Sequence, residues 1–193
     1  MDSSYFNSAR QLCIMENGNS PGVTRVVKAE EKHVQLLAEI GKRTFLESHG
    51  HSASRQDIDI YVANQYSEDS IRKKMADPKN LFSILFYNDE PVGFSNIIPD
   101  ASLPAIEQKN ITELDKLYLL QSFHGLQLGN AFIQYNIEIS KTRHQSGMWL
   151  YVWKENAKAI TFYKKHGFGI TGSHNFKISE TKSNPNHLMW LKY

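Results

Sequence analysis

The chain has 193 residues, of which 40% are hydrophobic and 22% are charged, as is typical of a globular domain with a sizeable core. Its net charge of +2 gives no electrostatic indication of a nucleic-acid or membrane partner. No apolar run approaches the roughly 20 residues that cross a bilayer, and the N-terminus lacks a signal-peptide pattern. The single cysteine, Cys13, has no partner for an internal disulfide, which favours a cytoplasmic protein.

Two periodicities alternate along the chain and predict its elements. Runs rich in β-branched and aromatic residues indicate strands, and apolar residues at three- and four-residue spacing indicate helices. In chain order, we predict a strand over residues 23–29, a helix over 30–48, helical pieces between 48 and 80 that include 67–77, strands over 81–87, 92–99 and 111–120, a helix over 129–143, a strand over 147–155, a helix over 156–166, and strands over 167–179 and 187–193. The mixture indicates a single α+β domain over residues 22–193, preceded by a loose, polar arm over residues 1–21.

The stretch HGLQLGNAF, residues 124–132, lies between a predicted strand and a predicted helix. A helix N-terminus leaves about four N–H groups unpaired and carries about half a positive charge, so it suits phosphate. Gly125 and Gly129 would let the backbone approach such a ligand. The same glycines equally suit an ordinary turn that packs tightly, and neither the P-loop nor the dinucleotide-binding pattern fits. The loop alone leaves both interpretations open.

Residues 149–168, WLYVWKENAKAITFYKKHGF, resemble the acetyl-CoA-binding end of the GNAT N-acetyltransferase family. The residues that carry this resemblance are Asn156, Ala159, Phe162, Tyr163, Gly167 and Phe168, at the family's spacing. The upstream loop is similar to the family's pyrophosphate loop. The resemblance implies a mixed, mostly antiparallel twisted sheet flanked by helices, with a parallel central strand pair at the cofactor site. It also implies acetyl-CoA as the co-substrate.

The resemblance assigns cofactor contacts to three segments. Backbone groups of Leu117 and Leu119 would pair with the pantetheine arm, and Asn156 would both cap its helix and reach that arm, although a cap alone explains an asparagine there. The loop residues expected at the pyrophosphate are His124, Gly125, Leu126, Gln127, Leu128, Gly129 and Asn130.

Two loop positions depart from the family. Gln127 stands where the family mostly has glycine, and His124 stands where it usually has arginine or glutamine. We expect Gln127 to donate its amide to the phosphate if its φ is negative. Cofactor binding should therefore survive with weakened or altered phosphate contacts.

By resemblance, Tyr163 is the general acid that protonates the departing CoA thiolate, and it also contacts the cofactor. A core tyrosine with a satisfied hydroxyl is the alternative. The N–H of Leu119 would stabilise the oxyanion. An alkyl amine with a pKa of about 10.4 is protonated at pH 7, so a base is required. We expect Glu113 in that role, on a strand face shared with Asp115, Leu117 and Leu119; a solvated carboxylate is the alternative.

The expected reaction is direct attack of a primary amine on acetyl-CoA in a ternary complex, because Cys13 lies in the arm and is a poor acyl carrier. The segments TFLESHG and GITGSHNF are softly similar to the diamine and polyamine branch and favour a small amine. A protein acceptor, or a CoA-binding sensor without catalysis, remains open.

Several other polar and aromatic residues carry weaker expectations. Carboxylates of the region 47–80 would attract a cationic amine or simply be solvated; these are Glu47, Asp57, Asp59 and Glu68. His49 and His51 lack further ligands, so we predict no metal site. Trp149, Tyr151 and Trp153 fit a core or a dimer contact, and members of the family often form homodimers.

Overall fold

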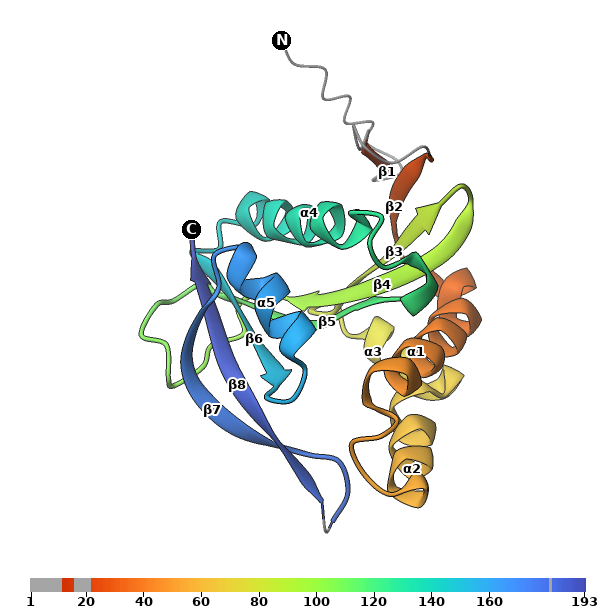
Figure 1. Ribbon diagram of the computed structural model, residues 1–193. Coiled ribbons are helices and arrows are strands. Elements are labelled where there is room, and N and C mark those ends of the chain that lie inside the picture. The colour runs from red at the N-terminus through yellow and green to blue at the C-terminus, as the bar shows by residue number, and fades with distance from the viewer. Residues whose placement is uncertain (1–11, 16–21, 181) are drawn as a thin grey trace.

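The computed structural model describes residues 12–15, 22–180 and 182–193. These residues form one mixed, eight-stranded sheet in the order β1-β2-β3-β4-β5-β6-β8-β7 (Figure 1). Its strands are β1 (Leu12–Met15), β2 (Thr24–Lys28), β3 (Leu81–Tyr87), β4 (Glu90–Ile98), β5 (Thr112–Leu119), β6 (Gly147–Trp153), β7 (Gly169–Lys177) and β8 (Ser183–Lys192). Its helices are α1 (Val34–His49), α2 (Arg55–Tyr66), α3 (Glu68–Ala76), α4 (Leu128–Thr142) and α5 (Ala157–Lys165), with short 3-10 turns η1 (Glu31–His33) and η2 (Gln121–Phe123). The α+β class and every element predicted after residue 22 are confirmed.

One strand lies where the sequence predicts only a loose arm. Residues Leu12–Met15 form β1, which pairs antiparallel with β2 through registers such as Met15 with Thr24. Four residues are too few to show an alternating pattern, and their pairing depends on an edge contributed by a later segment. The remainder of the expected arm, residues 1–11 and 16–21, lies outside the described residues.

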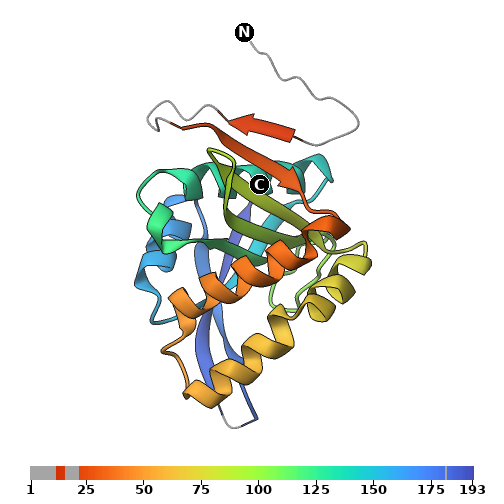
Figure 2. The ribbon, with the colours of Figure 1, turned by 90° about the vertical axis from the view of Figure 1, so that its right-hand side faces the viewer.

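The helices divide between the two faces of the sheet. Helices α1, α2 and α3 cover one face, and α4 and α5 cover the other, as the two side views show (Figures 1 and 2). The core on the α1 side includes Leu37, Ile58 and Phe94, whereas Ile133 and Ile137 of α4 pack on the opposite face. The chain thus buries both faces of its central strands β4 and β5.

Local sequence signals explain several element boundaries. The hydroxyl of Ser67 accepts the N–H of Ser70 at 3.3 Å, so Ser67 caps α3. Asn88 and Asp89 join β3 to β4 with positive φ values of 48° and 64°, the conformation of a two-residue hairpin turn.

The parallel pairing predicted for the centre of the sheet is confirmed, but it is short. Only Thr112 with Met148 and Glu113 with Trp149 are paired between β5 and β6 among the described residues. Beyond Glu113 the strands diverge (Figure 1), and β6 continues in pairing with β8 alone. The far half of β5 therefore presents an unpaired edge to a wedge-shaped opening.

A bulge interrupts β5 just where the wedge begins. Asn96 of β4 faces Lys116, and the next β4 residue, Ile97, faces Leu114, so Asp115 is an extra residue on β5. A bulge of this kind reverses the alternation of side chains along the rest of the strand. Odd-numbered side chains of β5 therefore point to one face of the sheet before the bulge and to the opposite face after it.

Candidate active site

The opening between β5 and β6 holds a cavity of about 640 Å³. Its walls come from the C-terminal end of α1, from β5, from the loop that precedes α4, and from β6 and α5. Predicted site residues that line it are Glu113, Leu117, Leu119, His124, Gly125, Gln127, Leu128, Gly129, Asn130, Asn156 and Tyr163. Leu126 does not line the cavity; it packs against the core that contains Leu128 and Phe132. Any contact of Leu126 with the cofactor would therefore come from its backbone rather than its side chain.

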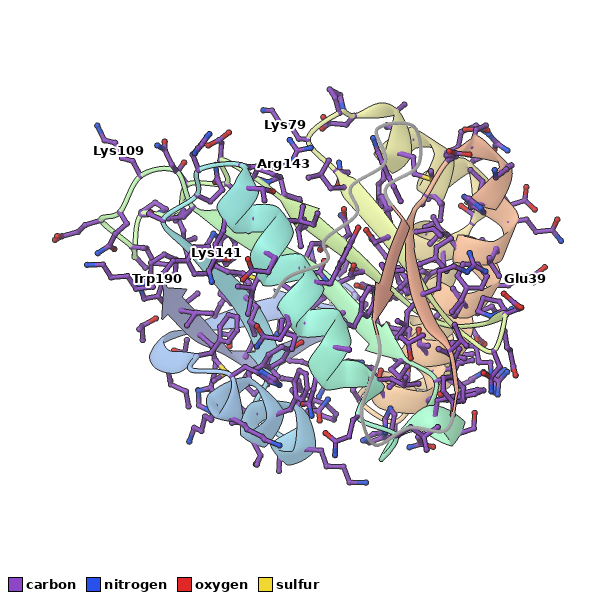
Figure 3. All side chains as sticks on the ribbon, turned by 90° about the horizontal axis from the view of Figure 1, so that it is seen from above. Glu39, Lys79, Lys109, Lys141, Arg143 and Trp190 are labelled. Atoms are coloured by element: carbon purple, nitrogen blue, oxygen red, sulfur yellow. The ribbon has the colours of Figure 1, made fainter. Side chains whose placement is uncertain are left out.

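One end of the cavity is a concave array of backbone N–H groups. In the described part of the chain, no hydrogen bond is donated by the N–H groups of residues 125–129. Gly125 and Gln127 have positive φ values of 87° and 60°, and α4 begins at Leu128. Alternating left-handed residues and a helix N-terminus are the geometry of an anion-binding nest. Figure 3 shows α4 from above, with Lys141 and Arg143 at its C-terminal end, so the nest lies at the far end of the helix.

The condition of a negative φ at Gln127 is not met, and the reason is local. The chain enters α4 from η2 by a sharp turn, and the residue before the helix must be left-handed, a conformation that glycine adopts at no steric cost. Gln127 adopts it nonetheless, with φ 60°, and its side-chain oxygen accepts a hydrogen bond from the Asn130 amide. The backbone N–H of Gln127 stays unpaired within the described residues. The preference for glycine at this position thus follows from backbone geometry.

The unpaired edge of β5 continues from the nest into the cavity. The N–H of Leu120 donates to Val92 of β4 at 2.8 Å, and backbone groups alternate in direction along a strand. The N–H and carbonyl of Leu119 and of Leu117 therefore point away from β4, toward the wedge. The ring Nε2 of His124 lies 3.1 Å from the Leu119 carbonyl, which places His124 at this edge.

Helix α5 forms the wall opposite that edge. The side-chain oxygen of Asn156 accepts the N–H of Ala159 at 3.1 Å, so the predicted cap is present. Tyr163 packs edge-on against Phe162 and Phe168 at ring distances of 5.3 and 5.6 Å. Burial raises the pKa of the Tyr163 hydroxyl well above its usual range. The hydroxyl is therefore protonated at neutral pH.

The bulge gathers three charged residues on the other wall. Burial, and then the negative charge of Asp115, raise the pKa of Glu113 to about 7, while Lys116 opposes the rise. Asp115 is buried too, yet the Lys116 ammonium at 3.0 Å and the Asn96 amide at 3.0 Å hold its pKa below the usual range. Asp115 and Lys116 thus remain an ion pair, and Glu113 is the group that titrates near neutrality.

The predicted face of Glu113 is only partly right. Asp115 bonds to Asn96 and lies near Glu113, but Leu117 and Leu119 pack toward α4, on the opposite face. The extra residue at Asp115 causes this change of phase. Strand alternation read from sequence could not show the bulge, although the adjacent charges of Asp115 and Lys116 inside an apolar strand were a signal of it.

Aromatic side chains line the remaining part of the cavity. His49 stacks on Phe45 at 5.1 Å and lies 5.8 Å from Trp153. Burial, followed by the proximity of His51, lowers the pKa of His49 to about 4, so its ring is neutral. Among residues 12–15, 22–180 and 182–193, no group of three or more potential metal-ligating side chains occurs.

The carboxylates suggested for acceptor binding are mostly committed elsewhere. Glu47 lines the cavity, but it pairs with Arg43 at 3.2 Å and accepts the N–H of Gln121 at 2.8 Å. The other three do not line the cavity and make local contacts, namely Asp57 with Ser54, Asp59 with Arg55 and Glu68 with Arg72. Within the described chain, no helix is long and apolar enough to cross a membrane.

Known proteins share this architecture. A sequence profile described as the acetyltransferase (GNAT) family matches residues 38–168, more than half of the chain. An uncharacterised N-acetyltransferase of Lactobacillus delbrueckii subsp. lactis is 25% identical over 158 residues, covering 82% of this chain and 91% of the relative. A spermidine N(1)-acetyltransferase of Thermoplasma acidophilum is 22% identical over 143 residues, covering 74% of this chain and 86% of that protein.

A solved structure gives the same result for the fold. The PaiA N-acetyltransferase from Thermoplasma acidophilum, in complex with coenzyme A, has a TM-score of 0.69 at 20% identity, covering 88% of this chain and 99% of that one. The chain belongs to the acetyltransferase (GNAT) family. The predicted fold and enzyme class are thereby confirmed, with acetyl-CoA as the acetyl donor.

Replacing Gly125 by alanine should weaken CoA binding. A Cβ at this position meets no atom within 4 Å, but the φ of 87° is strained for any residue with a Cβ. The left-handed penalty of about 1–2 kcal/mol would favour a relaxed loop in the free protein, and CoA would have to reverse that relaxation, so the loss of affinity is at most about 5- to 30-fold. Calorimetric titration with CoA measures it. Gly169→Ala is the control, because Gly169 has no positive φ and its nearest neighbour lies at 4.0 Å. Equal affinities of the two variants would contradict the nest.

Proposed function

We propose that this protein transfers the acetyl group of acetyl-CoA directly to a small primary amine in a ternary complex. One observation carries the proposal: the amide nest, the unpaired edge of β5, Glu113 and Tyr163 all line a single cavity. The nest suits the pyrophosphate, and the β5 edge suits the amides of the pantetheine arm, which would extend the sheet as an added strand. The thioester would then lie between Glu113 and Tyr163.

Glu113 is proposed as the general base. The acceptor arrives as an ammonium with a pKa of about 10.4 and must lose a proton before it attacks. A carboxylate with a pKa of about 7 is partly ionised at neutral pH and accepts that proton, directly or through water. The proton later passes from Glu113 to solvent.

Leu119 and Tyr163 are proposed to handle the tetrahedral intermediate. The new N–C bond forms as negative charge develops on the carbonyl oxygen, and the N–H of Leu119 at the open edge stabilises that charge. When the C–S bond breaks, the Tyr163 hydroxyl donates its proton toward the CoA sulfur, and the second proton leaves the attacking nitrogen and restores the Tyr163 hydroxyl, so that a neutral amide and CoA thiol result. The high pKa of this hydroxyl keeps the proton in place but makes complete transfer uphill, so a strong hydrogen bond to the departing thiolate is the main contribution.

The acceptor class is inferred from a relative of the chain. The likeness to a spermidine N(1)-acetyltransferase favours a small amine, and a polyamine is one candidate. A protein acceptor and a CoA-binding sensor remain the alternatives.

An amine panel with acetyl-CoA separates these alternatives. We expect released thiol with at least one small primary amine, from a panel that includes spermidine, an aliphatic monoamine and an aromatic monoamine. A peptide with a free N-terminus and lysine is tested in parallel. Turnover on the peptide alone would favour a protein acceptor, and CoA binding without turnover on any amine would favour a sensor.

Removing the Tyr163 hydroxyl should slow catalysis but leave cofactor binding intact. Tyr163→Phe keeps the ring that packs against Phe162 and Phe168, so the fold should be maintained. We expect kcat to fall about 100-fold or more, with CoA affinity within about twofold of the native value. Tyr135→Phe is the control, because Tyr135 is buried at 8% exposure and lies outside the cavity lining. An unchanged kcat would remove Tyr163 from the mechanism.

The acid limb of the pH profile should follow Glu113. We expect kcat/KM to rise with pH through a midpoint near 7, because the base must be ionised. Asp115→Asn removes the charge that raises the pKa of Glu113 and leaves Lys116, which lowers it, so the midpoint should shift to lower pH. Asp89→Asn, at an exposed hairpin turn, is the control. An unmoved or alkaline-shifted midpoint in Asp115→Asn would exclude Glu113 as the base.

A further inference from the structure

A chain of side-chain hydrogen bonds connects the first turn of α4 with the last turn of α5. The Gln134 amide lies 3.2 Å from Nδ1 of His166, and Nε2 of His166 lies 2.9 Å from the Asn130 oxygen. The amide of Asn130 then donates to the side-chain oxygen of Gln127. This series of hydrogen bonds ends on Gln127, one of the two loop positions that depart from the family pattern.

The donors and acceptors in this series of hydrogen bonds are all determined by the bond between Asn130 and Gln127. Because the Asn130 amide donates to Gln127, its oxygen is left to accept, and Nε2 of His166 must carry a hydrogen. Nδ1 is then the acceptor for the Gln134 amide, which defines a neutral imidazole. Burial, and then the neighbouring charge of Lys165, lower the pKa of His166, so the neutral form prevails at pH 7.

His166 does not itself line the cavity, whereas Asn130 and Gln127 both do. We propose that His166 is a positioning residue for the CoA phosphates, acting through Asn130 to hold the Gln127 side chain along the first turn of α4. Held there, the glutamine leaves the N–H groups of residues 125–129 open to the pyrophosphate. This inference rests on the CoA site of the proposed function.

The arrangement explains how a left-handed glutamine is compatible with an anion site. A glycine at this position has no side chain to control, so it needs no such chain of bonds. A glutamine released from Asn130 would instead be free to place its side-chain oxygen over the nest, where it would compete with phosphate for the same donors. His166 is itself held by its ring contact with Phe162, at 4.7 Å.

Calorimetric titration with CoA tests this role without requiring turnover. His166→Leu keeps an apolar contact with Phe162 but removes the hydrogen bond to Asn130. We expect its Kd to rise about tenfold, within the range measured for coupled neighbours. His166→Gln restores a side-chain N–H donor and should recover most of the affinity. Thermal unfolding of each variant shows that it is folded.

The Gln127→Gly background supplies the decisive comparison. With no glutamine side chain to hold, His166→Leu should change the Kd for CoA by less than twofold in this background. The same tenfold loss in both backgrounds, or no loss in the native one, would overturn the inference. If His166→Leu fails to fold, His166→Gln and Gln134→Met replace it. Near-native CoA affinity in His166→Gln together with a two- to threefold loss of affinity in Gln134→Met would support the role. A loss of affinity in His166→Gln with none in Gln134→Met would overturn it.

The calorimetry also separates this inference from the proposed function. Native protein that binds no CoA would overturn both. If the native protein binds CoA, but His166→Leu changes the Kd equally with and without the Gln127 side chain, only the role of His166 would be overturned.

Discussion

The early end of the parallel pairing between β5 and β6 is the constraint on which the rest of the site depends. A paired strand would saturate the backbone groups of Leu117 and Leu119, and an unpaired buried edge would be costly. This edge is tolerated because it borders a cavity of about 640 Å³ rather than a dry core. The open edge, the wedge and the nest before α4 are therefore one feature: a sheet left incomplete at a place where a ligand with amides can complete it.

The bulge at Asp115 determines which charged side chains lie beside Glu113. Without an extra residue, Lys116 would face α4 and Asp115 alone would lie beside Glu113. Without a cation beside them, two neighbouring carboxylates in a buried wall would raise the pKa of one of them strongly, so that it would stay protonated at neutral pH. With the bulge, Lys116 shares the wall with Asp115 and neutralises it, so that Glu113 experiences mainly burial and a partly compensated charge. A one-residue insertion in a strand thus sets the pKa of a carboxyl group.

The sequence predicted the features that depend on neighbouring residues, and it missed those that depend on contacts with distant segments. Periodicity identified the elements from β2 onward, and a motif pair within residues 124–168 indicated the expected cofactor end, because both signals are local. Strand β1 and the bulge at Asp115 depend on partners in other strands, so alternation could not show them. The left-handed Gln127 was also missed, since its conformation is imposed by the turn between η2 and α4. The connection from Gln127 to His166 spans two helices and has no signature in sequence spacing.

The cofactor end shows why such departures are tolerated. In the proposed function its anion contacts would come from the backbone N–H groups of residues 125–129, which every residue type except proline supplies. A side chain in this loop changes two things: the conformational free energy of a left-handed backbone, and the room left for a ligand at the N–H groups. At position 127 the backbone is left-handed, and the side chain is held by its hydrogen bond from Asn130, which in turn bonds to His166. Binding through the backbone thus lets the loop sequence vary, provided that another part of the fold controls whatever side chain is introduced.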